Sequence, residues 1–442
     1  MVYPWDFLHE WQPFKIDALG LVTLLGAQDV DNAIGRLVPS QWLEYMPLLA
    51  GYVIASDQFR QKKPAFNWYN ISSGIHTTDI SGWFSRWLMA QDFADTRSIV
   101  WWEVSHSHRG RRRGVHCLIA AAVSCCTTGM LIALAVLSRD WYGVANALSL
   151  SVSIVVRAYI LQANRAAIDA AIHEVEKNSE KGESWDHHVK TLLILPTSNV
   201  VTVMVPENLI RSVFVCNPTP RRAWLYQLAQ GIGWIAFGIH VVCLGMAQLA
   251  SQLCTTALLI LSTVLVCYRV GCDDFQGFSR QTNTNERAAC SPYTCWMGSR
   301  LQASVLEWPA EADFVKDKGG KWRQRQPGDT EPRSARRQDL YAWLNPSNEE
   351  EQSMAKWDLL PHSRGNATWL DDFQAKKDLV YADPVDIGHL LQSLSSSGGI
   401  YSGTLGSRQG DEEDIGTVRT MHGEVTTSEQ PLKASSTSSA IG

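Results

Sequence analysis

Apolar residues are concentrated between residues 109 and 270, where four long runs alternate with short polar connections. These runs are residues 116–137, 141–161, 227–248 and 253–268. A helix needs about 20 residues to cross the hydrocarbon core of a bilayer, so the pattern predicts four transmembrane helices. Three residues join the first two runs and four join the last two. Connections this short force antiparallel neighbours, which predicts two helical hairpins.

The segments around these runs define the other regions of the chain. We divide it into an aromatic-rich N-terminal region (1–108), the basic cluster with the first hairpin (109–165), a central insert (166–226), the second hairpin (227–270), a region with short helices (271–394) and a tail (395–442). The tail is rich in Ser, Gly and Thr, which predicts disorder. The predicted fold class is a mainly α membrane protein with four transmembrane helices in two antiparallel hairpins, a small β-hairpin-containing cytosolic insert and a partly disordered tail.

The insert carries the clearest strand signal. Its residues 190–195 and 200–205 are rich in β-branched side chains, and four turn-forming residues separate them. This pattern is typical of a β-hairpin. Residues 163–171 are rich in alanine, so the second transmembrane helix is expected to continue into the insert.

The N-terminal region holds two apolar stretches, 16–27 and 46–55, which are both too short to cross a bilayer. We expect them to form buried helices of a domain beside the membrane. An interfacial helix over residues 42–52 is the alternative. Trp101 and Trp102 suit either the lipid headgroups or the core of this domain.

Short helices are predicted in the C-terminal region. Residues 337–344 are apolar at helical spacing, and Ser347 with Glu350 fits a capping box for a helix that ends near Leu360. A last helix is expected over residues 383–394. Residues 316–337 are basic and rich in Gly, Gln and Pro, which predicts a flexible linker.

Arginines flank the four runs unevenly, and this asymmetry predicts the orientation. One side carries Arg109, Arg111, Arg112, Arg113, Arg165, Arg221, Arg222 and Arg269, whereas the other side carries Arg139 alone. Basic residues favour the cytosolic side, so the N-terminus, insert and C-terminus are all expected there. The sequence leaves the plasma membrane and the endomembranes open. Glycosylation at the sequons of Asn70 or Asn366 would overturn this orientation.

Small residues recur at spacings that let helices approach closely in lipid. The second run carries Gly143 and Ala147, and the first run carries Ala121, Cys125 and Gly129. The third run carries one stripe of Gly231, Gly238 and Gly245, and another, on the opposite side, of Gly233, His240 and Ala247. Two opposite stripes predict neighbours on both sides and therefore an inner position for the third helix.

Three polar residues within the runs are the intramembrane candidates for function. His240 is expected near mid-membrane, either bonded to a neighbouring helix or lining a polar path together with Gln248. Arg157 is expected near the cytosolic face, where a long side chain can snorkel to the surface.

Composition and motifs give no enzyme class. The chain has no phosphate-binding loop, dinucleotide fingerprint, nucleophile elbow or zinc-protease motif. His187 and His188 lack partner motifs for a metal, and no cofactor is predicted. The net charge of −5 does not favour binding to nucleic acid.

Six of the ten cysteines lie in apolar runs, where they act as packing residues. Near the end of the fourth run, Cys267 and Cys272 are candidates for palmitoylation.

Two phrases resemble an uncharacterised group of multipass integral membrane proteins of filamentous fungi. The first is Gly-Trp-Ile-Ala-Phe-Gly-Ile-His at residues 233–240, continued by Leu-Gly-Met-Ala at 244–247. The second is Asp-Leu-Tyr-Ala-Trp-Leu at residues 339–344, with Trp-Asp-Leu-Leu-Pro-His at 357–362 after it. The resemblance implies a four-helix membrane layout with a cytosolic tail, and no activity, cofactor or catalytic residue.

Three functions are therefore weighed. The first is a non-catalytic membrane scaffold whose cytosolic parts bind either a protein partner or lipid headgroups, with Arg109, Arg111, Arg112 and Arg113 as the basic cluster for anionic headgroups. The second is an oligomeric transport or channel component built on the third helix. The third, with the least support, is a lipid-modifying enzyme.

Overall fold

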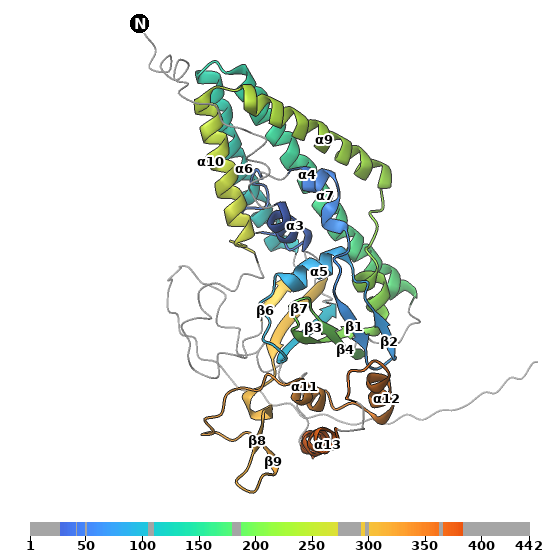
Figure 1. The fold of residues 1–442 in the computed structure, drawn as a ribbon. Helices are drawn as coiled ribbons and strands as arrows, with labels where there is room; N and C mark the ends of the chain where they lie inside the picture. Colours follow the sequence, from blue (N-terminus) through green and yellow to red (C-terminus); the bar gives the residue numbers. More distant parts are fainter. Residues whose placement is uncertain are drawn as a thin grey trace, which may run out of the picture. The chain divides into compact units, whose positions relative to one another are not determined.

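The computed structural model describes residues 27–40, 42–48, 51–104, 110–178, 187–272, 293–296, 300–361 and 366–382. The chain divides into two units, residues 1–395 and 396–442, and all described residues belong to the first. This unit is mainly helical, with four long apolar helices and a small mixed sheet (Figure 1). The predicted tail and the helix expected over residues 383–394 lie outside the described residues.

The four apolar runs all form helices that are long and apolar enough to cross a membrane. They are α6 (Gly110–Leu137), α7 (Trp141–Asn178), α9 (Ala223–Met246) and α10 (Leu249–Cys267). Helix α7 continues beyond the apolar run, as its alanine-rich sequence predicts. The bend between α9 and α10 is shorter than expected and consists of Ala247 and Gln248.

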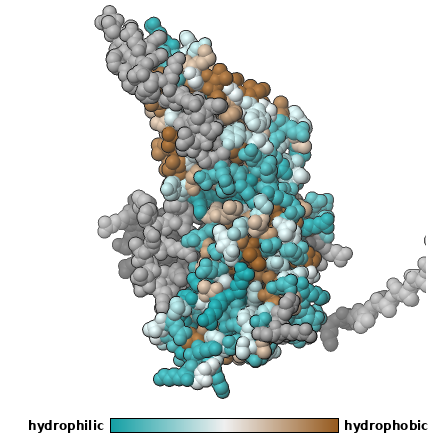
Figure 2. All heavy atoms as spheres, in the orientation of Figure 1, coloured by the Kyte–Doolittle hydropathy of each residue, from teal (hydrophilic) through white to brown (hydrophobic). Residues whose placement is uncertain are grey.

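Large apolar side chains cover the outer faces of these helices. Leu118 is 72% exposed, Val155 68% and Ile235 66%. Figure 2 shows hydrophobic residues gathered where Figure 1 draws these helices, whereas the surface over α11, α12 and α13 is mostly hydrophilic. A soluble protein rarely exposes apolar patches this large, so this surface is typical of one that meets lipid.

The seven strands of the main sheet come from three separate parts of the chain. They are β1 (Asn67–Asn70), β2 (Ile75–Thr77), β3 (Ser98–Val104), β4 (His188–Ile194), β5 (Val200–Pro206), β6 (Tyr293–Trp296) and β7 (Leu301–Glu307), in the spatial order β2-β1-β4-β5-β3-β7-β6. The predicted hairpin is β4 and β5, which pair antiparallel from His188 with Pro206 to Ile194 with Val200. Strand β1 pairs antiparallel with β4, and β3 pairs parallel with β5.

The insert therefore does not form an isolated hairpin, and the N-terminal region is not purely helical. Strands β1 and β3 flank the hairpin on its two sides, and β7 adds to β3 along its whole length. These strands were not predicted. Their pairing with β4, β5 and each other joins residues about a hundred positions or more apart, beyond the reach of local periodicity, although β1 and β7 also pair with the nearby β2 and β6.

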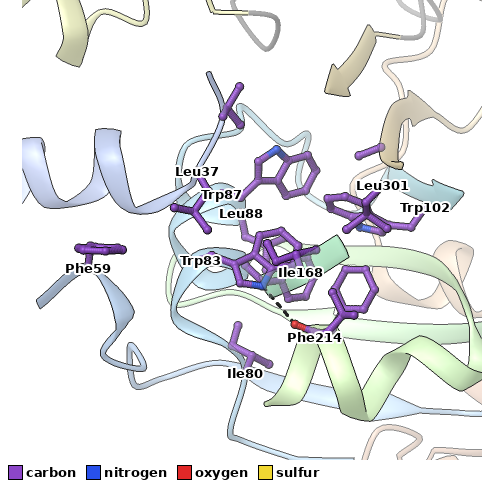
Figure 3. Close-up of a cluster of buried hydrophobic side chains, with 14 of the residues drawn as sticks. Leu37, Phe59, Ile80, Trp83, Trp87, Leu88, Trp102, Ile168, Phe214 and Leu301 are labelled. Carbon is purple, nitrogen blue, oxygen red and sulfur yellow. Dashed lines mark hydrogen bonds between the residues drawn. The ribbon is translucent and has the colours of Figure 1, made fainter. Parts of the chain in front are cut away.

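The two faces of the sheet bury two different sets of helices. One face packs against α5 (Gly82–Met89), the π-helical turn η2 (Ile210–Val215) and the far end of α7. Trp102 lies at the centre of this core, beside Trp83, Trp87 and Phe214 (Figure 3). Trp102 is fully buried. The core alternative for this residue is therefore correct, and Trp101 points to the other face, where it stacks on His188.

The opposite face packs against the C-terminal helices α11 (Arg337–Trp343), α12 (Asn348–Lys356) and α13 (Ala367–Ala382). The capping box of Ser347 and Glu350 is present, although α12 ends at Lys356 rather than near Leu360. Helix α13 was missed by the sequence analysis.

The segment predicted to be a flexible linker is ordered. It contributes to a small hairpin of β8 (Phe314–Lys316) and β9 (Trp322–Gln324), which follows the short helix η5 (Ala310–Ala312). Asp313, which is 2% exposed, binds the guanidinium groups of Arg325 and Arg333. Lys316 and Arg323 likewise form ion pairs, with Asp372 and Asp329, so several basic residues of this segment have carboxylate partners.

Short elements connect the sheet to the long helices. They are α3 (Ala27–Gly35), α4 (Gly51–Ala55), η1 (Gln58–Arg60) and α8 (Glu207–Leu209). The expected buried helix over residues 46–55 is reduced to α4, and residues 42–45 form turns, so the interfacial helix over 42–52 is not present. Arg86 on α5 is 1% exposed and donates to Asp31 on α3, which ties these two helices together.

Candidate functional site

His240 is bonded to a neighbouring helix. Its Nδ1 lies 2.6 Å from Oδ1 of Asn146 on α7, and Nδ2 of Asn146 donates to Oγ1 of Thr255 on α10. An amide oxygen can only accept, so Nδ1 of His240 carries the proton in this contact. The three buried side chains join α7, α9 and α10. This geometry matches the structural alternative for His240, and the sequence analysis missed Asn146 and Thr255.

Gln248 lies at the bend between α9 and α10, away from His240. Its backbone N–H donates to Oδ2 of Asp140, and its Nε2 donates to the carbonyl oxygen of Ser138. Oδ1 of Asp140 accepts from the N–H of Gly143. The two interhelical bends are therefore hydrogen-bonded to each other at one end of the four helices. Gln248 closes these bends and does not continue a polar path from His240.

The small residues of α7 pack as predicted. A methyl group added at Gly143 would meet Oγ of Ser251 on α10 at 2.9 Å and Oδ2 of Asp140 at 2.6 Å. Ala147 is fully buried in a cluster with Leu131 of α6 and Leu259 of α10. At these two positions α7 lies close to α6 and α10.

The glycine stripe of α9 does not pack as predicted. A methyl group at Gly231, Gly238 or Gly245 would meet no atom within 4 Å in the described part of the chain. Only the opposite stripe is buried, where Gly233 faces Val156 of α7 and Ala55 of α4. Helix α9 is therefore not an inner helix within this chain. Likewise, Gly129 of α6 faces open space, and α6 packs through Ala120, Ser124, Thr128 and Leu131 instead.

Arg157 is buried rather than snorkelling to the surface. It is 4% exposed, and its Nη2 donates to the carbonyl oxygens of Glu44 and Met46. Two turns later on α7, Arg165 donates from Nη1 to Oε1 of Glu44 at 2.7 Å and from Nε to the carbonyl oxygen of Leu37. The two arginines hold the loop before α4 against α7.

Glu44 is the carboxylate of this arrangement. Burial raises the pKa of Glu44, but the charge and hydrogen bond of Arg165, the N–H of Ser40 and the charge of Arg157 together hold that pKa below its ordinary value. Glu44 is therefore ionised at neutral pH. We call Arg157, Arg165 and Glu44 the arginine junction.

A pocket lies on the C-terminal helices, on the far side of the sheet from the core around Trp102. It has a volume of about 640 Å³ and is lined by Arg336, Arg337, Gln338, Tyr341, Asp358, Leu359, Pro361, Thr368, Trp369 and Asp372. We call this pocket the C-terminal groove. Its volume falls in the range of ligand and peptide sites, and the sequence analysis did not anticipate it.

The floor of the groove is fixed by a buried lysine. Nζ of Lys376, which is fully buried, donates to Oε1 of Gln338 and to Oδ1 of Asp339. It also lies 3.9 Å from the ring centre of Trp322. Burial lowers the pKa of Lys376, which Asp339 opposes. These contacts place α11 against α13 and leave Tyr341 and Trp369 on the groove wall.

The other residues considered in the sequence are His188, the basic cluster and the sequon of Asn70. Nε2 of His188 lies 2.8 Å from the carbonyl oxygen of Trp102, and among the described residues no three His, Cys, Asp or Glu side chains could hold a metal together. Arg111, Arg112 and Arg113 fall in the first turn of α6, whereas Arg109 lies outside the described residues. Asn70 is 8% exposed within β1, which makes it a poor acceptor for a glycan.

Comparison with protein-family models, with curated proteins and with solved structures gives no match to this chain. The resemblance to fungal membrane proteins therefore stays a prediction.

Proposed function

We propose that the chain is a multipass integral membrane protein whose four apolar helices cross the bilayer as two antiparallel hairpins. The order of the strands and helices along the chain supports this arrangement. Helices α6 and α7 lie in the sequence between β3 and β4, and helices α9 and α10 lie between β5 and β6. Strands that pair in one sheet must lie on the same side of a membrane. Each helix pair therefore has to return the chain to the side it left.

We infer that this side is the cytosol. The arginines at the sheet ends of the helices outnumber the single Arg139 at the bends, and this asymmetry favours a cytosolic sheet. The hydrogen bonds between the two bends, from Gln248 to Asp140 and Ser138, support a shared position for them on the opposite side.

Within this framework, we propose a non-catalytic scaffold that holds a cytosolic protein partner at the membrane. The observation that carries this proposal is the C-terminal groove. Trp and Arg are enriched among the residues that dominate the energetics of protein interfaces, and the groove offers the half-buried Trp369 and the exposed Arg337. Tyr341 also lines the groove but is only 2% exposed. Arg336 adds a second guanidinium, so the bound segment should carry a carboxylate between apolar side chains.

Asp358 and Asp372 both line the groove, and Asp372 does not cancel this preference. Asp372 already accepts from Nε1 of Trp322 at 2.7 Å and lies 3.8 Å from Nζ of Lys316. Its charge is therefore matched within the chain. The guanidinium of Arg336 has no ion-pair partner among the described residues, which leaves it available for an acidic segment.

Partner capture tests the scaffold proposal. The full-length protein and the Arg336→Glu/Trp369→Ala variant would be crosslinked in native membranes and purified under identical conditions. Lys62→Glu is the control, because Lys62 is an exposed cation that pairs with Asp79 and does not line the groove. We expect one cytosolic partner with the parent and the control, and its loss with the groove variant at equal abundance. Equal recovery by all three, or no partner at all, would refute the proposal.

The exposed glycine face of α9 favours an oligomeric transport component as the second candidate. Gly231, Gly238 and Gly245 leave room for a helix of another copy. His240 faces the opposite way, toward Asn146. This candidate predicts that Gly238→Leu lowers the oligomer size and the solute flux of reconstituted protein together. A monomer without flux would exclude it.

A further inference from the structure

A small cavity lies at the arginine junction, where α3, the loop before α4, α7 and the end of α10 meet. Its volume is about 40 Å³, and its polar lining consists of Arg36, Ser40, Glu44, Arg157, Arg165 and Cys272. Arg157, Leu161 and Arg165 follow one another at four-residue spacing on one face of α7. Val266 and Val270 bring in the end of α10. The cavity thus lies where two of the apolar helices leave their long apolar runs.

The hydrogen bonds of Arg157 to described residues include no carboxylate. Glu44 forms its ion pair with Arg165, at 2.7 Å. Arg157 meets only neutral carbonyl oxygens in its hydrogen bonds to described residues, and its Nε has no hydrogen-bond partner among them. Burying a guanidinium costs free energy unless an anion and a full set of hydrogen bonds compensate it. Arg157, at 4% exposure, has neither in full.

We infer that the cavity binds a phosphate group, with Arg157 as its principal ligand. A guanidinium is a planar fork that matches phosphate oxygens with two parallel hydrogen bonds. A water needs about 10 to 15 Å³ of such volume, so 40 Å³ accommodates roughly three water-sized groups. The three terminal oxygens of a phosphoryl group fit this space.

The walls indicate how such a group would arrive. Leu43, Leu48, Leu161 and Val266 line the cavity beside the arginines. An apolar wall next to cations suits a phospholipid headgroup with its chains beyond it, and free phosphate supplies the same chemistry without the chains. This site is separate from the basic cluster at Arg109 to Arg113 and does not depend on the C-terminal groove.

Thermal unfolding of the full-length protein tests the site. Purified protein would be incorporated into phosphatidylcholine nanodiscs with and without phosphatidic acid, and inorganic phosphate would be titrated against chloride at equal ionic strength. We expect phosphatidic acid or phosphate to raise the midpoint, because a ligand that binds the folded state stabilises it. Stabilisation by phosphatidic acid alone identifies a headgroup site, and stabilisation by inorganic phosphate identifies a site for the free ion.

Two variants and one control decide the result. Arg157→Gln should weaken phosphate binding about tenfold or more, since it removes charge-assisted hydrogen bonds. Ala33→Leu keeps every cation and fills the cavity from α3, so it should abolish the ligand-induced shift even if Arg157→Gln fails to fold. Arg139→Gln, at the opposite end of the helices, should bind like the parent. The inference is wrong if neither probe stabilises the parent beyond chloride, or if Ala33→Leu retains the full shift.

Discussion

Trp101 and Trp102 are neighbours on β3 but lie on opposite faces of the sheet, and this makes them a matched pair for testing the fold. Trp102 is fully buried, with ring centres of Trp83, Phe84, Trp87 and Phe214 at 5.7, 6.0, 4.9 and 5.2 Å. Trp101 is half-buried and stacks on the ring of His188 at 4.1 Å.

We expect Trp102→Ala to cost about 4 to 5 kcal/mol, the upper part of the range for buried Trp or Phe to Ala substitutions. The reason is that four rigid rings surround the site and cannot collapse into the space. Trp101→Ala removes one stacked pair and partial burial, which corresponds to about 1 kcal/mol. The two variants should therefore differ by about 3 to 4 kcal/mol.

Pulse proteolysis in urea measures this difference on the detergent-solubilised protein, because the protease cuts the sheet only when it is unfolded. With a urea dependence of about 2 kcal/mol per molar, Trp102→Ala should lower the midpoint by about 2 M and Trp101→Ala by about 0.5 M. Equal shifts, or a larger shift for Trp101→Ala, would refute the assignment of Trp102 to the shared core.

Three other contacts give sharp expectations. Gly143→Ala should destabilise the protein in detergent by about 1 to 3 kcal/mol, because the new methyl group overpacks the site, and thermal unfolding should show a lower midpoint. Gly238→Ala should leave the unfolding midpoint of the monomer unchanged. The pKa of Glu44 is held below its ordinary value, so this carboxylate contributes stability above its unfolded-state pKa. That contribution is lost as the pH falls through the lower folded-state pKa. The thermal midpoint of the parent should therefore fall more steeply in acid than that of Glu44→Gln, and equal slopes would contradict this. Lys376→Met should cost about 3 to 5 kcal/mol in a urea titration, because it leaves Asp339 buried and unpaired, and adding Asp339→Leu should restore most of it.

Local patterns were sufficient for elements whose signals lie within one stretch of sequence. The four apolar helices, the β4–β5 hairpin, the start of α11 and the capping box of Ser347 all follow from residues within a few turns of one another. The sequence of β3 carries no such local signal. Both of its faces are buried, one under α5 and one beside the C-terminal helices, so it shows no alternation of apolar and polar residues.

The candidate site depended on distant partners, which a single sequence does not reveal. Arg157 resembles a snorkelling residue until Glu44 and Met46 are known to lie beside it. The two small-residue stripes of α9 are equally plausible as packing faces in sequence, and only the contact of Gly233 with Val156 distinguishes them. Asn146 was the one available signal, since an amide within an apolar helix needs a partner.

The central claim is that all three strand-bearing segments lie on one side of the membrane, with both helical bends on the other. Cys216 is exposed beyond η2 on the sheet side, and Arg139 is exposed at a bend. Sealed vesicles with the cytosolic face outward would carry the parent or Arg139→Cys protein, and labelling by a membrane-impermeant maleimide would be mapped by peptide. The account predicts labelling of Cys216 in intact vesicles, and labelling at position 139 in the variant only after permeabilisation. Labelling of both positions in intact vesicles would contradict it.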